Sequence, residues 1–306
     1  MAMVKRIIIN FLLLTATVFI LDFAIGRTLR YYYFREESGT HYRTAYSINT
    51  TTAEFLILGS SRATHHYVPE VFEAKTGMSF YNTGRQGTGI FHQLAVLTAI
   101  LNRYKPEVII LDYAGDFRLG DNSYDRLSSL LPYYREHEEL HQIIELKSPY
   151  EKIKLLSEIY PFSSRVQQII RGNMESNKIK ESDDKGYVAL HGSWKADLDT
   201  VDNYPRFGLD SLKIDAFRLL IHKAKEAGSK VFIIRSPVFI KTTWNDDAEI
   251  CLEQSKAEDI KFWDFSQDTL FLNHKNLFMD TGHLNHEGAL IFSKIISDSI
   301  APYLRH

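Results

Sequence analysis

The chain has 306 residues, of which 44% are hydrophobic and 24% are charged, so it is long enough to form one large globular domain, or a domain with an insertion, around a sizeable core. Its formal net charge of −2 leaves no basic excess to attract phosphate backbones, which argues against nucleic acid as a partner. The single cysteine, Cys251, excludes an intrachain disulfide and a cysteine cluster for zinc, and we expect it to be an ordinary packed side chain.

The N-terminal segment differs from the rest of the chain. Residues 7–25 are almost wholly apolar and follow the basic pair Lys5-Arg6. A bilayer core requires about 20 apolar residues in a helix, and this stretch reaches that length only if Asp22 lies near an interface, where its carboxylate stays hydrated. We therefore predict that residues 1–27 are an N-terminal membrane anchor or signal, which contacts the membrane through residues 7–25. The aromatic run 31–34 suits the headgroup region.

The orientation of this segment is not decided by flanking charge, because arginines follow it as well as precede it. A short leading segment with a basic start is the usual signal-anchor arrangement, which favours a cytoplasmic N-terminus. The expected location is a single pass through a bacterial-type inner membrane, with the remaining chain facing the periplasm or exterior. Because Ala24-Ile25-Gly26 loosely fits a small-x-small cleavage site, secretion after signal cleavage is the alternative, and a buried core helix is a third.

After a connector at 28–54, the chain alternates short apolar runs with helical patterns. Strands are predicted at 55–58, 78–82, 108–111, 231–234 and 260–265. Helices are predicted at 71–75, 91–104, 214–227 and 288–300. Strands separated by helices of this length form parallel sheets with helices on both faces, so the fold class is α/β, a doubly wound parallel sheet in a three-layer, flavodoxin-like sandwich. Ligands bind such sheets at the carboxyl ends of the strands.

A long excursion interrupts this alternation. Residues 117–210 are too many for a simple crossover, and they contain helical patterns at 126–135, 149–157 and 163–170. We interpret them as a helical insertion in an α/β domain that spans 55–306. Since the insertion leaves the sheet from the edge where ligands bind, it is a candidate lid or acceptor-binding wall.

Two short motifs carry the chemistry. Gly59-Ser60-Ser61-Arg62 directly follows the first strand, and Asp280-Thr281-Gly282-His283 lies near the C-terminus. A strand that ends in a tight glycine turn can hold a serine hydroxyl at the carboxyl edge of the sheet. Serine is a weak nucleophile until an imidazole takes its proton and a carboxylate orients that imidazole. The two motifs together supply all three groups.

These motifs resemble those of the SGNH or GDSL family of serine hydrolases and acyltransferases, over the segment 55–116 and from residue 260 onward. The resemblance implies that Ser61 is the nucleophile, with Ser60 as its competitor. The family's last block, Asp-x-x-His, implies that His283 is the general base and Asp280 its orienting partner. Its fold would be the doubly wound sheet predicted above.

The family's second block, an Asn followed by a glycine loop, looks like residues 81–87. The family's oxyanion-hole glycine stands a fixed distance after this Asn, so the resemblance implies Gly87, with Gly84 as the alternative. The backbone N–H of Ser61 would be the other donor. The third block departs from the family, because Gly-x-Asn-Asp is expected and this chain has residues 112–116 without an asparagine. If Asp116 matches the family's aspartate, Gly115 takes the asparagine's place, and Asn82 or Asp116 would be a supporting residue.

Three further side chains near the serine are candidates for a role in catalysis or substrate binding. His65 and His66 follow it closely, but adjacent histidines at the start of a helix are more often surface residues, and this is the interpretation we favour. Arg62 could pair with a carboxylate of a substrate, although bracing the turn is the better supported interpretation.

The resemblance implies an exported, membrane-tethered serine esterase that acts on an O-acyl or O-acetyl ester of a cell-envelope or extracellular glycan, without cofactor or metal. One alternative is an O-acyltransferase of the same fold. The other is a non-catalytic glycan-binding or assembly protein, which the missing asparagine motivates and the retained Ser61, Asp280 and His283 argue against.

Overall fold

The computed structural model describes residues 1–113, 115, 117–120, 122–174, 184–197, 199–200, 208–242 and 246–304. The chain divides into two compact units. The first combines Met1–Tyr42 with Leu127–Ser182, and the second combines Arg43–Arg126 with Asp183–His306. The domain limits expected from the sequence, with a connector at 28–54 and an insertion at 117–210, stay a prediction.

A five-stranded parallel sheet forms the centre of the second unit, with the strand order β2-β1-β3-β5-β7. The strands are β1 (Phe55–Gly59), β2 (Phe80–Asn82), β3 (Val108–Asp112), β5 (Lys230–Arg235) and β7 (Lys261–Asp264). This finding confirms the predicted α/β fold with a parallel sheet. The chain leaves β1 first toward one edge and then returns to the other side through β3, so the sheet has its topological switch point between β1 and β3.

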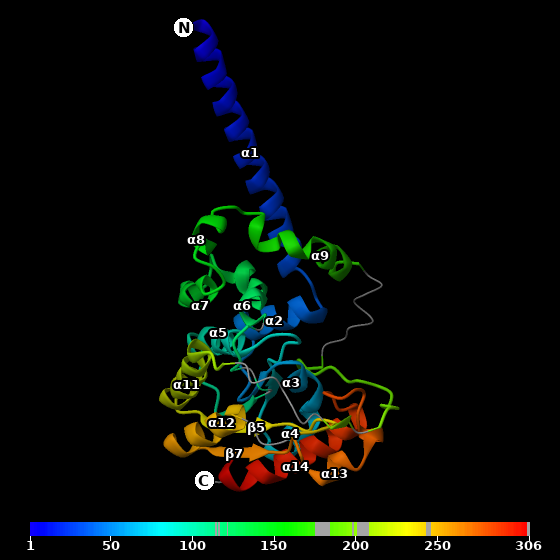
Figure 1. Cartoon of the computed structure of the whole chain (residues 1–306). Helices are drawn as coiled ribbons and strands as arrows, with labels where there is room; N and C mark the ends of the chain where they lie inside the picture. The colour runs from blue at the N-terminus through cyan, green and yellow to red at the C-terminus, as the bar shows by residue number, and fades with distance from the viewer. Residues whose placement is uncertain are drawn as a thin grey trace. The chain divides into compact units, whose positions relative to one another are not determined.

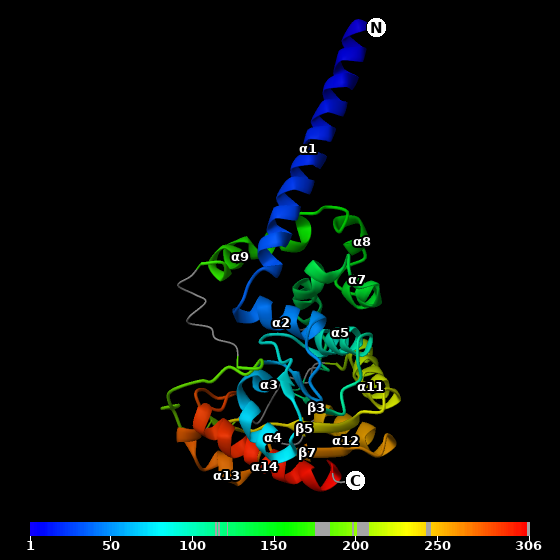
Figure 2. The same cartoon turned by 180° about the vertical axis from the view of Figure 1, so that it is seen from behind.

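Helices cover both faces of this sheet, which explains why residues 55–58 of β1 and 108–111 of β3 are all apolar. All five residues of β1 and of β3 are buried. On one face, Ile57, Ile110 and Ile234 belong to a cluster with Phe292 and Ile296 of helix α14. Helices α5 and α11 pack against each other and against the strands on the opposite side of the sheet (Figures 1 and 2).

The helices of the second unit match the predicted periodic segments, with additions. They are α3 (Ser61–His66), α4 (Pro69–Thr76), α5 (Ile90–Leu101), α6 (Ser123–Arg126), α11 (Ser211–Glu226), α12 (Asp246–Ala257), α13 (Thr269–Leu272), α14 (His286–Leu304) and the 3₁₀-helix η4 (Lys275–Leu277). A small parallel pair joins β4 (Asp199–Thr200) to β6 (Ile240–Lys241). Helix α2 (Gly39–Asn49) lies in the predicted connector.

Gly59 ends β1 where two segments approach too closely for a side chain. A Cβ at this position would lie 2.5 Å from the Cβ of Ala63 and 3.0 Å from the carbonyl oxygen of Asp112. We expect Gly59→Ala to lower the free energy of unfolding by about 1–3 kcal/mol, the usual cost of overpacking, as measured by denaturant titration of the full chain in detergent. Adding Ala63→Gly removes the opposing methyl and should recover part of the loss. If the double variant loses as much unfolding free energy as the two single variants together, the steric explanation is wrong.

The first unit contains α1 (Ala2–Phe34), a helix long and apolar enough to cross a membrane. Its Asp22 carboxylate accepts hydrogen bonds from Ser157 Oγ at 2.5 Å and from the backbone N–H of Glu158 at 2.7 Å. One turn later, Gly26 lies so close to Glu158 that a Cβ there would be 2.3 Å from its backbone. The polar residue that interrupts the apolar segment is therefore bound by another part of the same unit.

The other elements of this unit are short. They are the 3₁₀-helices η1 (Leu127–Tyr133), η2 (Glu138–Leu140) and η3 (Tyr160–Arg165), and the helices α7 (His141–Glu145), α8 (Glu151–Lys154) and α9 (Val166–Gly172). The predicted aromatic belt is divided, because Tyr33 is buried beside Tyr133 and Phe162, whereas Tyr31 and Tyr32 are exposed. Tyr33 thus belongs to the core of the unit.

Candidate active site

Ser61 occupies the first position of helix α3, directly after β1. Ser60 links the strand to the helix, and its side chain makes no capping hydrogen bond. Since β1 and β3 flank the topological switch point, this turn lies where the carboxyl ends of neighbouring strands open a crevice. As the first residue of the helix, Ser61 has a backbone N–H without an intrahelical acceptor.

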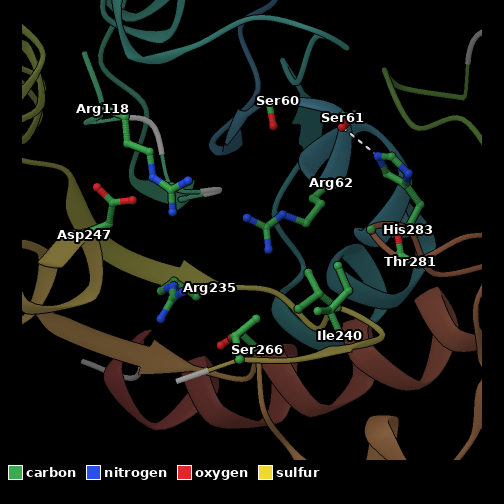
Figure 3. A pocket seen from close by; sticks show the side chains of 14 residues that line it. Ser60, Ser61, Arg62, Arg118, Arg235, Ile240, Asp247, Ser266, Thr281 and His283 are labelled. Carbon is green, nitrogen blue, oxygen red and sulfur yellow. Dashed lines mark hydrogen bonds between the residues drawn. The ribbon is translucent and has the colours of Figure 1, made fainter. Parts of the chain in front are cut away.

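The structure brings together the three residues that the motifs singled out. The hydroxyl Oγ of Ser61 lies 2.7 Å from Nε2 of His283 (Figure 3). Nδ1 of His283 lies 2.9 Å from each carboxylate oxygen of Asp280. A carboxylate can only accept hydrogen bonds, so Nδ1 carries the proton and Nε2 accepts from the serine hydroxyl. A hydrogen-bond chain in this order is able to activate a serine.

Asp280 is held as an ionised acceptor. Partial burial acts to raise the pKa of its carboxyl group, but hydrogen bonds from the His283 ring and from the backbone N–H groups of Gly282 and His283 outweigh burial and lower that pKa. The same two backbone bonds, of 2.8 and 2.9 Å, both end on Oδ1. The loop therefore fixes which carboxylate oxygen faces the backbone.

His65 and His66 are buried, which corrects the expectation that they lie at the surface. His66 is fully buried, and its Nε2 accepts the backbone N–H of Leu284 at 2.9 Å, which ties helix α3 to the loop that carries His283. His65 donates from Nδ1 to the carbonyl of Val188 at 2.7 Å and packs edge-on against the His283 ring. Sequence spacing gave no sign of this support, because the partners lie more than a hundred residues away.

Burial, reinforced by the positive charge of Arg62, holds the pKa of His66 well below its usual value. In the unfolded chain, the His66 ring binds a proton below about pH 6.5, whereas in the folded protein the same ring stays neutral at that pH. The stability of the folded protein therefore includes the full contribution of neutral His66 above about pH 6.5 and loses it as the pH falls further. We expect His66→Gln, which keeps an acceptor but cannot titrate, to make the pH dependence of unfolding free energy shallower by about 1.4 kcal/mol per pH unit between about pH 6.5 and 5. Denaturant titrations of both proteins at several pH values measure this slope. An unchanged slope would contradict a neutral, buried His66.

Asn82 and Gly84 fasten the glycine loop to helix α3. The Asn82 side chain donates from Nδ2 to the carbonyl of Ala63 at 2.6 Å and accepts the backbone N–H of Gly84 at 2.9 Å. A Cβ at Gly84 would lie 2.7 Å from the backbone nitrogen of Thr64, so a larger residue does not fit. Gly87 is exposed with φ +69°, a left-handed backbone that favours glycine, and it does not line the pocket described below.

Residues 112–116, which the sequence matched to the family's third block, fall only partly within the described residues. Asp116, a predicted supporting residue, lies outside the described residues, and Gly115 has φ +83° and lines the pocket. Asp112 ends β3 and is fully buried, where its Oδ1 accepts the hydroxyl of Ser236 at 3.1 Å. Burial raises the pKa of Asp112, whereas Arg62 and Ser236 act to lower it.

A pocket of about 320 Å³ opens beside the serine, and it is lined by Ser60, Ser61, Arg62, Gly115, Arg118, Arg235, Val238, Ile240, Thr242, Asp247, Ser266, Thr281, Gly282 and His283. Figure 3 shows Ser61 and His283 at one end and Arg118, Arg235 and Asp247 at the other, with Arg62 between them. Its volume is at the lower end of small-molecule sites. The described residues contain no group of three or more His, Cys, Asp or Glu side chains placed to hold a metal ion.

No family model matches this chain, and no curated protein matches its sequence. Among solved structures, the chain is similar to a proposed acylhydrolase from Bacteroides fragilis at 12% identity and a TM-score of 0.42, over 82% of this chain and 88% of that chain. It is also similar to an acetyl xylan esterase at 11% identity and a TM-score of 0.40, over 82% of this chain and 99% of that chain.

Proposed function

We propose that the protein is a serine esterase with Ser61 as nucleophile, His283 as general base and Asp280 as the residue that orients His283. The observation that carries this proposal is the continuous hydrogen-bond chain from Ser61 Oγ through His283 to Asp280. Its order and its protonation are those that serine hydrolysis requires. A protein that only binds its ligand has no need of this chain, which argues against the non-catalytic alternative.

In the first step, the Ser61 oxygen attacks the acyl carbonyl while His283 Nε2 takes the hydroxyl proton. The C–O bond to the alcohol then breaks, and His283 returns the proton to the leaving oxygen, which leaves an acyl-serine. Water, activated by His283, attacks the acyl-serine and releases the acid. In an acyltransferase of the same fold, a sugar hydroxyl would replace that water.

The backbone N–H groups of Ser61 and Gly87 are the proposed donors to the oxyanion. Of the two glycines that the motif offers, Gly84 has its N–H engaged by the Asn82 side chain, which favours Gly87. Asn82 donates to the carbonyl of Ala63 and thereby supports the loop. One such donor contributes about 3 kcal/mol in related acyl-transfer reactions.

We further propose that residues 7–25 of helix α1 anchor the protein in a membrane, with the N-terminus on the cytoplasmic side. The apolar residues of this segment are exposed, as a lipid-facing helix requires. The contacts of Asp22 with Ser157 and Glu158, and the close packing of Gly26, favour an uncleaved anchor over a signal peptide. Cleavage after Gly26 would cut the helix and remove these contacts. An O-acyl group on an envelope or extracellular glycan is the substrate class that this location suggests.

The function is tested with the full chain in detergent. Hydrolysis of a short-chain aryl acetate and covalent labelling by a fluorophosphonate should both occur and should both depend on Ser61. Labelling without hydrolysis, followed by transfer of the acetyl group to an added glycoside, would indicate the acyltransferase. If neither labelling nor turnover is found, the proposed reaction is wrong.

A further inference from the structure

The pocket beside Ser61 contains a buried positive charge without a direct ion pair. Arg62 is only 9% exposed, and its side chain donates from Nη1 to the carbonyl of Ser236 at 3.2 Å and from Nη2 to the carbonyl of Tyr113 at 3.4 Å. Both acceptors are neutral. Asp112 lies near enough to affect Arg62 electrostatically, but none of the described carboxylates forms an ion pair with it. A buried charge in this state is costly unless an anion compensates it.

Arg235 brings a hydrogen-bond donor without an acceptor to the same pocket. Its Nη1 binds the carboxylate of Asp264 at 2.6 Å, whereas its Nε–H has no acceptor among the described residues. Arg235 as a whole is 9% exposed, so water does not readily satisfy this group. The hydroxyl of Ser266, also buried and lining the pocket, likewise has no partner within the described chain.

Three arginine side chains extend toward the same space from different elements. In Figure 3, Arg62 reaches in from helix α3, Arg235 from the end of β5, and Arg118 from the segment after β3. Asp247 is the one acidic side chain among the lining residues, and it stands beside Arg118 at the end away from Ser61. From Arg62 to its far end, the pocket therefore presents guanidinium groups, whose planar N–H pairs match the oxygens of carboxylates and phosphates.

We propose that this pocket binds an anionic group, a carboxylate or a phosphate, through Arg62 and Arg235. That the group belongs to the ester substrate rests on the function proposed above, since Arg62 directly follows Ser61 in the chain. Such a group would compensate the charge of Arg62 and supply an acceptor for Arg235 Nε–H. It would also hold the ester next to the serine hydroxyl.

Direct binding tests this site separately from catalysis. The full-length Ser61→Ala protein, in a non-ionic polyoxyethylene detergent, is titrated by calorimetry with succinate, D-glucuronate and glycerol 3-phosphate, with D-glucose as the neutral control. We expect at least one anion to bind at least tenfold more tightly than glucose. The tightest probe shows whether the charge belongs to the acyl group, to a sugar or to a phosphorylated polyol.

Adding Arg62→Gln to this protein should weaken binding of the preferred anion at least tenfold and leave the weak binding of glucose little changed. Because Arg62 also holds two backbone carbonyls, a milder variant guards against misfolding. Arg235→Lys keeps a positive charge near Asp264 but lacks the Nε–H, and it should weaken the same anion severalfold. Thermal unfolding of each variant shows that it is folded.

Equal binding of glucose and all three anions, or anion binding that neither variant changes, would overturn the proposed site. The outcomes for the site and for the esterase are distinguishable. Ser61-dependent hydrolysis without anion binding would refute the anion site alone. Anion binding that depends on Arg62, in a protein without hydrolysis or labelling, would support the site and refute the esterase.

Discussion

Ser61→Ala is expected to lower the rate of aryl acetate hydrolysis by about 10⁴-fold or more, because the variant has no nucleophile for His283 to activate and keeps only the contribution of binding and of the oxyanion donors. Fluorophosphonate labelling should disappear. Within the described chain the hydroxyl makes one hydrogen bond, to His283, so its removal should cost only about 1 kcal/mol of stability. Steady-state hydrolysis and gel-based labelling of the full chain measure these effects.

Ser60→Ala is the matched control, because Ser60 is the neighbouring hydroxyl and makes no capping bond to helix α3. We expect this variant to keep its activity within about tenfold of the wild type, as is usual for a side chain that contacts the substrate without reacting. Loss of labelling in Ser60→Ala together with retained labelling in Ser61→Ala would exchange the roles of the two serines. Thermal unfolding of both variants separates chemistry from folding.

Asp280→Asn is expected to reduce hydrolysis by about 10⁴-fold, as the corresponding change does in a serine protease. In the wild type, Oδ1 of Asp280 accepts two backbone N–H groups. The asparagine oxygen would take that position, which turns its NH₂ toward Nδ1 of His283. The proton of His283 would then move to Nε2, so that Nε2 could no longer accept the proton of Ser61.

The control for this prediction is Asp268→Asn. Asp268 caps helix α13 by accepting the N–H of Leu270, and asparagine caps a helix about as well as aspartate does. Hydrolysis by Asp268→Asn should equal that of the wild type. An Asp280→Asn protein that is folded and hydrolyses the ester within about tenfold of the wild-type rate would show that Asp280 does not set the tautomer of His283.

Local sequence patterns sufficed for the sheet. The runs 55–58 and 108–111 are apolar at every position because their residues are buried on both faces, and this requirement acts on each strand separately. The same holds for amphipathic helices such as α11 and α14, whose apolar side chains recur at helical spacing. Patterns of this kind did not predict helix α3, which is short and begins at Ser61 without a capping side chain.

The excursion shows where local patterns fail. Helical spacing at 126–135 predicted a single helix, but the chain forms the short α6 and then the 3₁₀-helix η1, which contains Pro132. A proline inside a helix removes a backbone hydrogen bond and clashes with the preceding turn, so the segment takes a tighter, shorter form. The burial of Tyr33 beside Tyr133 was also unpredictable, because the two are one hundred residues apart in the chain.

The sequence by itself determined the α/β class, the apolar N-terminal helix and the choice of Ser61, Asp280 and His283, since each depends on neighbours within a few residues or on a family motif. Only the tertiary structure decided that Ser61 lies within hydrogen-bonding distance of His283, that His66 is buried and anchors the loop of His283, and that Arg62 and Arg235 meet in one pocket. The physical reason is the large sequence separation of the residues that interact. Hydrogen bonds and burial between residues more than a hundred positions apart depend on how the strands are ordered, and no local pattern encodes that order.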